Sequence, residues 1–413
     1  MRHLSPLLIL AILNALAPRV GAEPLRLTID EAVARATAAN LDLSASRKDL
    51  DLARANSERS RAWFPANPFL SGGVQHTTQS SGPNYTLLLS QEVEVAGQRG
   101  KRVAAALQET EKATAELKNQ ELTLAAGVKS AFIHALISYD RVALAHTNAD
   151  RTAEVAQRAS ARTPSSDIQR IEVNNALIQA TRTRRELAGA EQVRDAALSA
   201  LRQLLGLSAD QELELSGTPE TSPKDLPPTP ELVSRALQQR PDLLALRHAA
   251  QRTDLQVDVA QREAIPNVTL TGVYMRFEGD SLAGGDIGVP LPVFQQKTAE
   301  IHEAVAERER TAVQLQSLER TIEKEVSDAR RACSVAAADL QAQQRDIVPR
   351  SEENVRLERR AFERGEVELS DLMGVESDLV TARHEYLDAL EAYNTSLIEL
   401  ERVTGGNSPQ PPR

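Results

Sequence analysis

The feature that most constrains the fold is an internal repeat with an offset of 200 residues. Eight residues of the first half recur at equivalent positions in the second. They are Glu31, Val33, Arg35, Ala36, Asp42, Leu43, Ala45 and Arg47, matching Glu231, Val233, Arg235, Ala236, Asp242, Leu243, Ala245 and Arg247. Self-similarity at a fixed offset indicates one structural unit used twice. We therefore predict two structural repeats, over residues 23–218 and 231–405, with a Pro-rich linker at 219–230 and a disordered tail at 406–413.

Residues 1–22 have the pattern of a secretory signal peptide. A basic residue, Arg2, precedes an apolar run from Leu7 to Leu13, and small residues lead to a cleavage site after Ala22. A transmembrane anchor needs roughly 18 or more uninterrupted apolar residues, and Pro18 interrupts this stretch. The mature chain is therefore predicted to begin at Glu23.

Charge and cysteine content exclude several functional classes. The full sequence has a formal net charge of −10, and the mature chain is two units more negative because the leader carries two arginines and no acid. Such a balance argues against a nucleic-acid partner. The single cysteine, Cys333, excludes an internal disulfide, a cysteine-based zinc cluster and an N-terminal lipid anchor.

Motifs of catalysis are missing, so we predict no enzyme activity, no cofactor and no metal site. The segment Gly97–Arg102 superficially resembles a phosphate loop, but its glycine spacing is wrong and no Ser or Thr follows Lys101. The histidines are scattered without a pair at ligand spacing on one helix face. Solvated or packing histidines explain them better.

Long helices are predicted in both repeats, because aromatic residues make up only 3% of the chain and heptad patterns are extended. Each repeat is expected to contain a medium helix, a β-hairpin, a very long helix, a tip and a returning helix. The medium helices should end near residues 62 and 264, before Pro65 and Pro266. The first long helix should run from Gln98 to about Arg162, roughly 95 Å at 1.5 Å per residue. The clearest seams are Leu315, Leu318, Ile322, Val326, Ala329, Cys333, Ala336 and Leu340, and then Leu372, Leu379, Tyr386, Tyr393 and Leu400.

The hairpins are predicted over residues 66–96 and 266–295. Period-two alternation is clearest from Tyr85 to Val95, and turns are expected at Gly82–Asn84 and Gly279–Gly285. Runs of about 10 residues have the length of a tilted membrane-spanning strand, although a soluble hairpin with one wet face shows the same alternation. Aromatic residues near the start of the first hairpin favour the membrane. No later segment approaches the length of a transmembrane helix, so any membrane insertion is assigned to these strands.

The tips are expected near residues 160–168 and 362–371. Ser166 and Gln169 have capping-box spacing, and Ser370 is predicted to cap a helix that begins at Asp371. Acids at helix starts are favoured by the helix dipole, so Asp167 and Asp371 have a purely stabilising interpretation beside any functional one.

Motifs across the mature chain resemble the TolC-type outer-membrane efflux family. The C-terminal motifs Phe362–Gly365, Leu369–Leu372 and Leu400–Gly405 resemble the closing helix pair of that family. The stretches Glu94–Arg102 and Val289–Phe294 are similar to its heavy-metal and cation branch, with multidrug export as the alternative. The first tip lacks the glycine present at Gly365.

This resemblance implies a mainly α fold with a small β part: a long antiparallel coiled-coil α-barrel and a transmembrane β-barrel built from two hairpins per protomer. It implies a homotrimer with twelve strands, in outer-membrane lipid and extending into the periplasm, that conducts substrate passively. Its partners would be a periplasmic adaptor (membrane fusion) protein and an inner-membrane pump. The implied gate residues are Asp167, Asp371, Arg162, Arg360 and Arg364, and the implied adaptor-docking tip is Gly365, Leu369, Ser370 and Leu372.

Two rival classes fit part of the pattern. A soluble periplasmic coiled-coil adaptor explains the helices and the leader but not two matched hairpins of spanning length. A periplasmic enzyme explains secretion alone.

Overall fold

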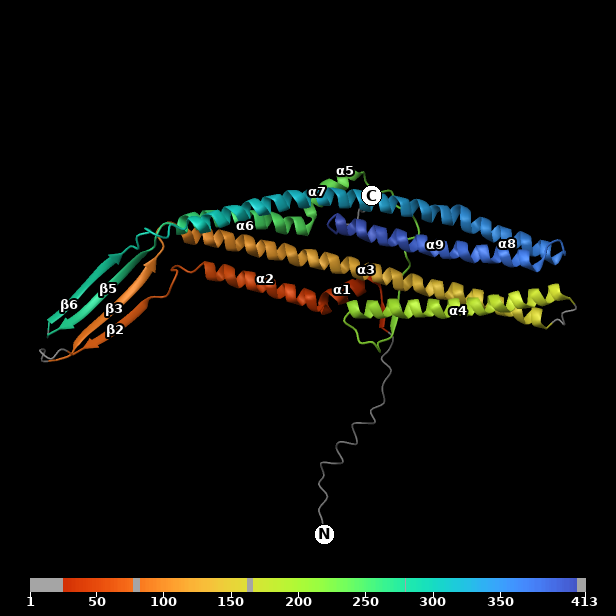
Figure 1. Ribbon diagram of the computed structural model, residues 1–413, viewed down its shortest axis with the longest axis horizontal. Coiled ribbons are helices and arrows are strands. Elements are labelled where there is room, and N and C mark those ends of the chain that lie inside the picture. The colour runs from red at the N-terminus through yellow and green to blue at the C-terminus, as the bar shows by residue number, and fades with distance from the viewer. Residues whose placement is uncertain (1–24, 77–81, 162–165, 279, 407–413) are drawn as a thin grey trace, which may run out of the picture. The chain divides into compact units, whose positions relative to one another are not determined.

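The structure, a computed structural model, describes residues 25–76, 82–161, 166–278 and 280–406 (Figure 1). The chain forms two compact units. Unit 1 takes its residues from Met1–Ala39, Gly127–Pro223 and Ala338–Thr395, and unit 2 from Asn40–Ala126, Lys224–Ala337 and Ser396–Arg413. Each unit therefore draws on both halves of the sequence, and the repeat boundaries stay a prediction.

Unit 2 contains a four-stranded antiparallel sheet in the order β2-β3-β5-β6 (Figure 1). The strands are β2 (Phe69–Gln75), β3 (Asn84–Val93), β5 (Val268–Phe277) and β6 (Asp280–Gly288). The helices of the unit are α2 (Leu41–Ser60), the first part of α3 (Gln98–Ser160), α5 (Thr229–Gln239), α6 (Pro241–Glu263) and most of α7 (Thr298–Ala342). Helices α2 and α3 pack through Leu50, Ala53 and Ala113.

Unit 1 is built from helices and one small sheet. Its helices are α1 (Ile29–Ala39), the rest of α3, α4 (Asp167–Leu204), α8 (Val348–Glu363) and most of α9 (Leu369–Val403), with a π-helical turn η3 (Gln343–Ile347) before α8. Strand β1 (Leu25–Leu27) pairs in parallel with β4 (Leu213–Leu215). This pair is not predictable from periodicity, because three-residue strands are too short to show a period.

The medium helices are each broken in two, which corrects the prediction of single helices. Asn40 has an extended backbone and its Oδ1 accepts the backbone N–H of Leu43 at 2.9 Å, so it caps α2. Arg240, also extended, precedes Pro241, the first residue of α6. Proline disfavours helical conformation in the residue before it, so α5 ends there.

Turn placement in the second hairpin also differs from the prediction. The residues Gly279–Gly285 were expected to form the turn, yet Asp280–Gly288 is strand β6. Gly284 and Gly285 pair with Val273 and Gly272 of β5. In a strand, glycines permit close approach of the neighbouring backbone. The chain therefore reverses earlier than predicted, between Phe277 and Asp280.

Most residues of the predicted helix seams are buried, while Leu315, Leu318, Ala336 and Tyr386 are half-buried. Ile322, Val326, Cys333 and Leu340 of α7 are fully buried, and so is Tyr393 of α9. The coiled-coil pattern therefore identified the core correctly.

One helix contradicts the expectation that no later segment is long and apolar enough to span a membrane. By length and composition alone, a stretch of α3 meets that criterion. About a third of the stretch is buried inside the protein. A coiled-coil helix with an apolar seam satisfies the same test, so the finding is weak evidence for a membrane helix.

Candidate functional site: an amphipathic sheet and two helix tips

The four-stranded sheet has one apolar and one polar face. Strand pairing places Leu87 opposite Tyr274 and Leu270 opposite Ile287. Directly paired residues of antiparallel strands point to the same face. The apolar face therefore carries Leu70, Val74, Tyr85, Leu87, Leu89, Val93, Val268, Leu270, Tyr274 and Ile287. The opposite face is the more polar of the two, because it carries Thr86, Ser90, Thr269 and Thr271 together with the acids Glu92, Asp280 and Asp286. It also carries apolar residues, among them Leu88, Val273 and Met275.

The edges of this sheet are open in the part of the chain that the structure describes. Strand β2 pairs only with β3, and β6 pairs only with β5. Unpaired backbone groups cost several kcal/mol each in lipid, so in a membrane both edges require further strands.

A buried polar network joins the sheet to the helices. Gln98, the first residue of α3, is 2% exposed. Its Oε1 accepts the N–H of Ala96 at 2.9 Å, and its Nε2 donates to Asn267 Oδ1 at 3.0 Å. Asn267 in turn donates to Glu92 Oε1 at 2.7 Å. The end of β3 is thereby fixed to the segment that leads into β5.

Basic residues after β3 are engaged within the protein. Arg102 pairs with Glu94 at 2.6 Å, and Lys101 pairs with Asp258 at 2.5 Å. Arg99 donates to backbone carbonyls after α2 at 2.8 and 3.1 Å. Local acids and carbonyls therefore occupy the donors that a phosphate would need.

Leucine at Gln98 should destabilise this junction. The change leaves the amide of Ala96 and the Oδ1 of Asn267 without their hydrogen-bond partner, and a buried unsatisfied polar group costs about 1–3 kcal/mol. Thermal unfolding should show a clear loss for Gln98→Leu. Gln157→Leu, at an exposed position of the same helix, is the matched control and should change little. Equal unfolding of the two variants would contradict the role assigned to the network.

The first tip keeps its predicted cap. Ser166 Oγ accepts the N–H of Gln169 at 3.3 Å and caps α4. Asp167 is almost fully exposed, and Arg170 lies 4.0 Å away in the same helix. The predicted gate residue Arg162 lies outside the described residues.

The second tip brings Arg364 to a different acid from those predicted. Its guanidinium donates to Glu366 at 2.6 and 2.8 Å, and this hydrogen bonding holds the pKa of Glu366 below its ordinary value. Arg360 forms no ion pair within the described chain. In one chain, therefore, neither arginine is paired with Asp167 or Asp371, and the gate assignment stays a prediction about an assembly.

The start of α9 corrects one cap. The helix begins at Leu369, not at Asp371, and Glu368 precedes it. Asp371 Oδ2 accepts the N–H of Glu368 at 3.2 Å, whereas Ser370 Oγ donates to Glu368 Oε2 at 3.4 Å. Asp371 therefore supports the helix start from inside the first turn. Gly365, with φ of +73°, follows α8, and Leu372 is buried, while their role in adaptor docking stays a prediction.

Alanine at both Asp167 and Asp371 distinguishes a gate from helix capping. If threefold copies of these acids hold the tube shut, the double variant should show a higher single-channel conductance with unchanged trimer yield. Exposed ion pairs contribute under about 1 kcal/mol each, so such a gate would open easily. Unchanged conductance with a lower trimer melting temperature would assign both acids to capping, which contributes about 0.5–2 kcal/mol.

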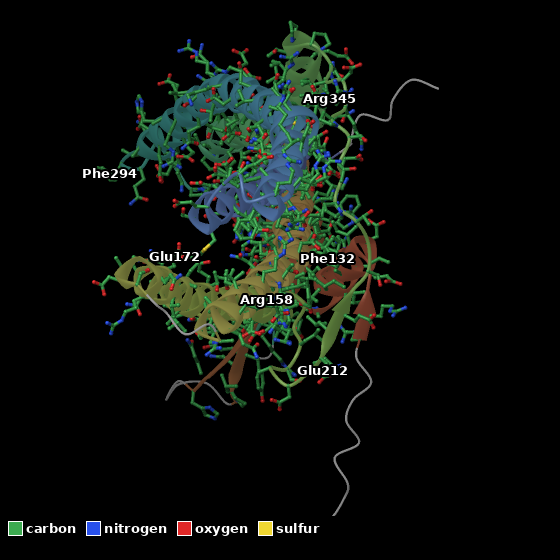
Figure 2. All side chains as sticks on the ribbon, turned by 90° about the vertical axis from the view of Figure 1, so that its right-hand side faces the viewer. Phe132, Arg158, Glu172, Glu212, Phe294 and Arg345 are labelled. Atoms are coloured by element: carbon green, nitrogen blue, oxygen red, sulfur yellow. The ribbon has the colours of Figure 1, made fainter. Side chains whose placement is uncertain are left out.

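A charged cluster in unit 1 was missed by the sequence analysis. Arg141 of α3 pairs with Asp388 at 2.5 Å and with Glu391 at 2.7 Å, both on α9. His134 Nδ1 lies 2.6 Å from the same Glu391 carboxylate. Nearby in sequence, Phe132 is buried in this unit (Figure 2). His134 and Arg141 are seven residues apart on α3, and Asp388 and Glu391 are three residues apart on α9. Neither spacing indicates a cluster until the two helices are known to be neighbours.

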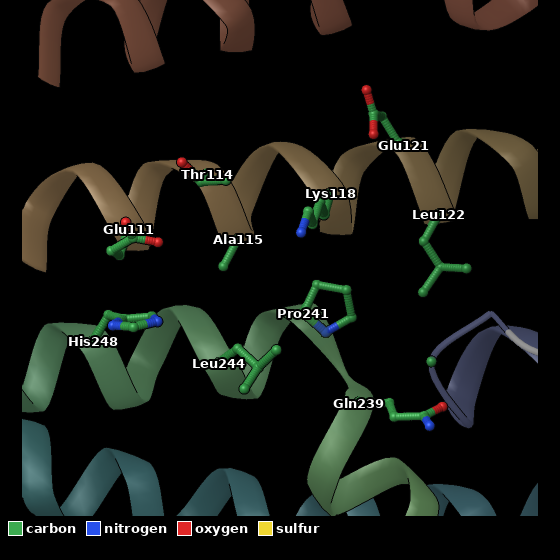
Figure 3. Close-up of a pocket in the computed structure, with 11 residues that line it drawn as sticks. Glu111, Thr114, Ala115, Lys118, Glu121, Leu122, Gln239, Pro241, Leu244 and His248 are labelled. Carbon is green, nitrogen blue, oxygen red and sulfur yellow. The ribbon is translucent and has the colours of Figure 1, made fainter. Parts of the chain in front are cut away.

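A shallow cleft lies between α3 and α6 (Figure 3). Glu111 and Lys118 line it from α3, and Leu244 and His248 line it from α6. His248 Nδ1 lies 2.8 Å from Gln108 Oε1. Among the described residues, no three His, Cys, Asp or Glu side chains are placed to hold a metal ion.

Comparison with known proteins gives one family and several relatives. The family model "Outer membrane efflux protein" matches residues 32–207 and 232–406. The chain is 27% identical to the cobalt-zinc-cadmium resistance protein CzcC of Cupriavidus metallidurans, over 94% of this chain and 92% of that protein.

Solved structures share the fold. CusC, described in work on folding and transmembrane channel formation, is 18% identical with a TM-score of 0.78, covering 95% of this chain and 96% of its own. The CmeC outer membrane channel of Campylobacter jejuni is 16% identical with a TM-score of 0.75, covering 92% and 85%. The open-state MtrE outer membrane channel of Neisseria gonorrhoeae is 19% identical with a TM-score of 0.76, covering 92% and 89%.

Proposed function

The chain belongs to the outer membrane efflux protein family, and from this premise we propose that it is one subunit of a trimeric, passive channel that exports metal cations. Members of this family are conduits of tripartite efflux systems and not enzymes. The proposal concerns the finer points, which are the trimer, the membrane-spanning strands, the substrate and the partners.

The amphipathic sheet with two open edges is the observation that carries the proposal. One chain supplies four strands with an apolar face, and it leaves the outer edges of β2 and β6 unpaired. Three chains joined edge to edge would give a closed ring of twelve strands, which satisfies every backbone group in lipid. The polar face would then line the lumen.

Chemical cross-linking tests the trimer. One cysteine is introduced at Val74 on β2 and one at Ser281 on β6, and a short bifunctional maleimide tolerates the unknown register between copies. The natural Cys333 is fully buried, and burial raises the pKa of its thiol, so it should not react. Trimers should form with both cysteines present. Single-cysteine chains serve as controls, and a stable folded monomer in detergent would contradict the proposal.

Metal cations are the proposed substrate for two reasons. The match to a cobalt-zinc-cadmium resistance protein covers nearly the whole chain, and the formal net charge is −10 before the leader is removed. Acidic pores favour cations. Export of organic compounds is the second candidate, because the fold shared with the outer membrane channels CmeC and MtrE does not select a substrate.

A tolerance assay separates the two substrates. Cells without the gene should lose tolerance to cobalt, zinc or cadmium and keep tolerance to organic toxins, and the restored gene should reverse the loss. Loss of tolerance to organic compounds alone would favour the second candidate. A periplasmic adaptor and an inner-membrane pump are the proposed partners, because a passive channel has no energy source of its own.

A further inference from the structure

Charge is segregated between the two faces of the sheet. Within the four strands the acids Glu92, Asp280 and Asp286 all lie on the polar face. The one basic residue of these strands, Arg276, lies on the apolar face, where it pairs in register with Tyr85 and Ser281. A charge on the proposed lipid side of a membrane sheet needs an explanation, because such charges are costly in hydrocarbon.

Arg276 has no anionic partner among the residues that the structure describes. Its side chain is exposed and makes no ion pair with either acid of the adjoining reversal, Glu278 or Asp280. Its register partner on β6, Ser281, has its Oγ 3.2 Å from Tyr274 Oη. The guanidinium is therefore free to bind an anion from outside the chain.

Its depth agrees with the headgroup region of a bilayer. From Val268 to Arg276 the strand advances roughly 26 Å at about 3.3 Å per residue. A strand tilt of about 40° reduces this to a depth of roughly 20 Å, close to the apolar band of about 25 Å in outer-membrane barrels. Arg276 thus lies at the far boundary of the apolar band, beside Tyr85 and Tyr274, where interfacial aromatic residues gather.

We propose that Arg276 binds the phosphate of a phosphorylated glycolipid in the outer leaflet, which gives three equivalent lipid sites per trimer. The inference rests on the proposed function, because it requires the apolar face to meet lipid. Arginine binds phosphate through two parallel N–H donors, and its register partners Tyr85 and Ser281 both carry hydroxyl groups. The β5–β6 reversal is the end of the hairpin remote from the helices, so its side chains reach the outer leaflet and not the periplasmic one.

The test measures lipid retention by native mass spectrometry on full-length, delipidated trimers. The probes are bisphosphorylated lipid A, its dephosphorylated form and inorganic phosphate. Wild-type trimers should bind up to three copies of the phosphorylated lipid. Arg276→Gln should weaken that binding roughly tenfold, since a charge-assisted hydrogen bond is lost. The affinity of Arg276→Lys should lie between those of wild type and Arg276→Gln, because lysine keeps the positive charge but lacks the two parallel N–H donors of the guanidinium.

Arg185→Gln is the matched control, since it removes one exposed arginine from α4, a helix of unit 1 that contributes nothing to the sheet, and should bind lipid like wild type. Equal retention of phosphorylated lipid by wild type and Arg276→Gln would overturn the inference. So would equal binding of the dephosphorylated lipid, or displacement of the lipid by millimolar inorganic phosphate, which would indicate a site for a soluble anion.

A partner within the trimer is the remaining alternative for Arg276. In that case Arg276→Gln would lower the melting temperature of lipid-free trimers and leave lipid retention unchanged, which also overturns the inference. If the proposed function itself were wrong, wild-type chains would form no trimer in detergent, and this result is distinguishable from a trimer that binds no lipid.

Discussion

Arginine at Leu87 is expected to abolish trimer assembly, whereas arginine at Thr86 leaves it intact. The two residues are neighbours on β3 but face opposite sides of the sheet, since Leu87 pairs with Tyr274 and Thr86 with Met275. An arginine facing lipid costs roughly 2–4 kcal/mol at the midplane of a barrel and less towards the interface, and Leu87 lies two residues inward from Tyr85 along β3. A trimer carries three such arginines, so their costs add. An arginine facing a water-filled lumen remains hydrated.

The measurement is the yield of heat-modifiable trimers in outer-membrane fractions at matched expression. Thr86→Arg is itself the control for the added volume and charge. If the two variants assembled equally well, the apolar face would not meet lipid, and the membrane orientation proposed for the strands would be wrong.

Alanine at Arg240 should lower the stability of the chain strongly. Its side chain is 7% exposed, and it donates to Asp242 at 2.6 and 3.0 Å and to Glu325 at 2.5 Å. Removing one partner of a fully buried ion pair costs about 3–5 kcal/mol. Asp242 and Glu325 are 25% and 38% exposed, so water stabilises the carboxylates left behind and the loss should be smaller than that. The same side chain sits at the break between α5 and α6, so the loss should loosen α6 from α7.

Trimer melting temperature in detergent measures this effect. Arg331→Ala is the control, because Arg331 is 70% exposed and forms an ion pair with Asp328 on the same helix. Exposed pairs contribute at most about 1 kcal/mol, so that variant should melt close to wild type. A similar, small decrease for both variants would show that the Arg240 cluster contributes no more than a surface pair.

The faces of the strands and the seams of the helices were predictable from sequence, because both depend on local periodicity. The alternation of Tyr85, Leu87 and Leu89 fixed one face of β3, and the burial of Ile322 and Val326 followed from three- and four-residue steps. These signals survive folding because the period of a strand or helix decides which side chains share a face.

Features that depend on distant contacts were not predictable in the same way. The parallel pair β1–β4 joins Leu25 to Leu213, and the Arg141 cluster joins α3 to α9. The break at Asn40 had a recognisable cap, but the apolar periodicity on both sides concealed it. At the start of α9, Ser370 was a plausible cap by residue type, yet Asp371 accepts the N–H of Glu368.

The candidate gate would depend on contacts between chains. Arg364 is paired with Glu366 and Asp371 with the backbone of Glu368, so the local contacts of these residues are satisfied without a gate. A threefold arrangement would bring together copies that one chain does not contain.

Planar-bilayer recording of the purified wild-type protein tests the central claim most directly. The account predicts that detergent-extracted trimers insert to give stepwise, long-lived conductance, with reversal potentials in a salt gradient that indicate cation preference. The Leu87→Arg protein, prepared identically, should give no steps. Absence of conductance from intact wild-type trimers would contradict the assignment of this chain as an efflux channel, and a preference for anions would contradict the proposed export of metal cations.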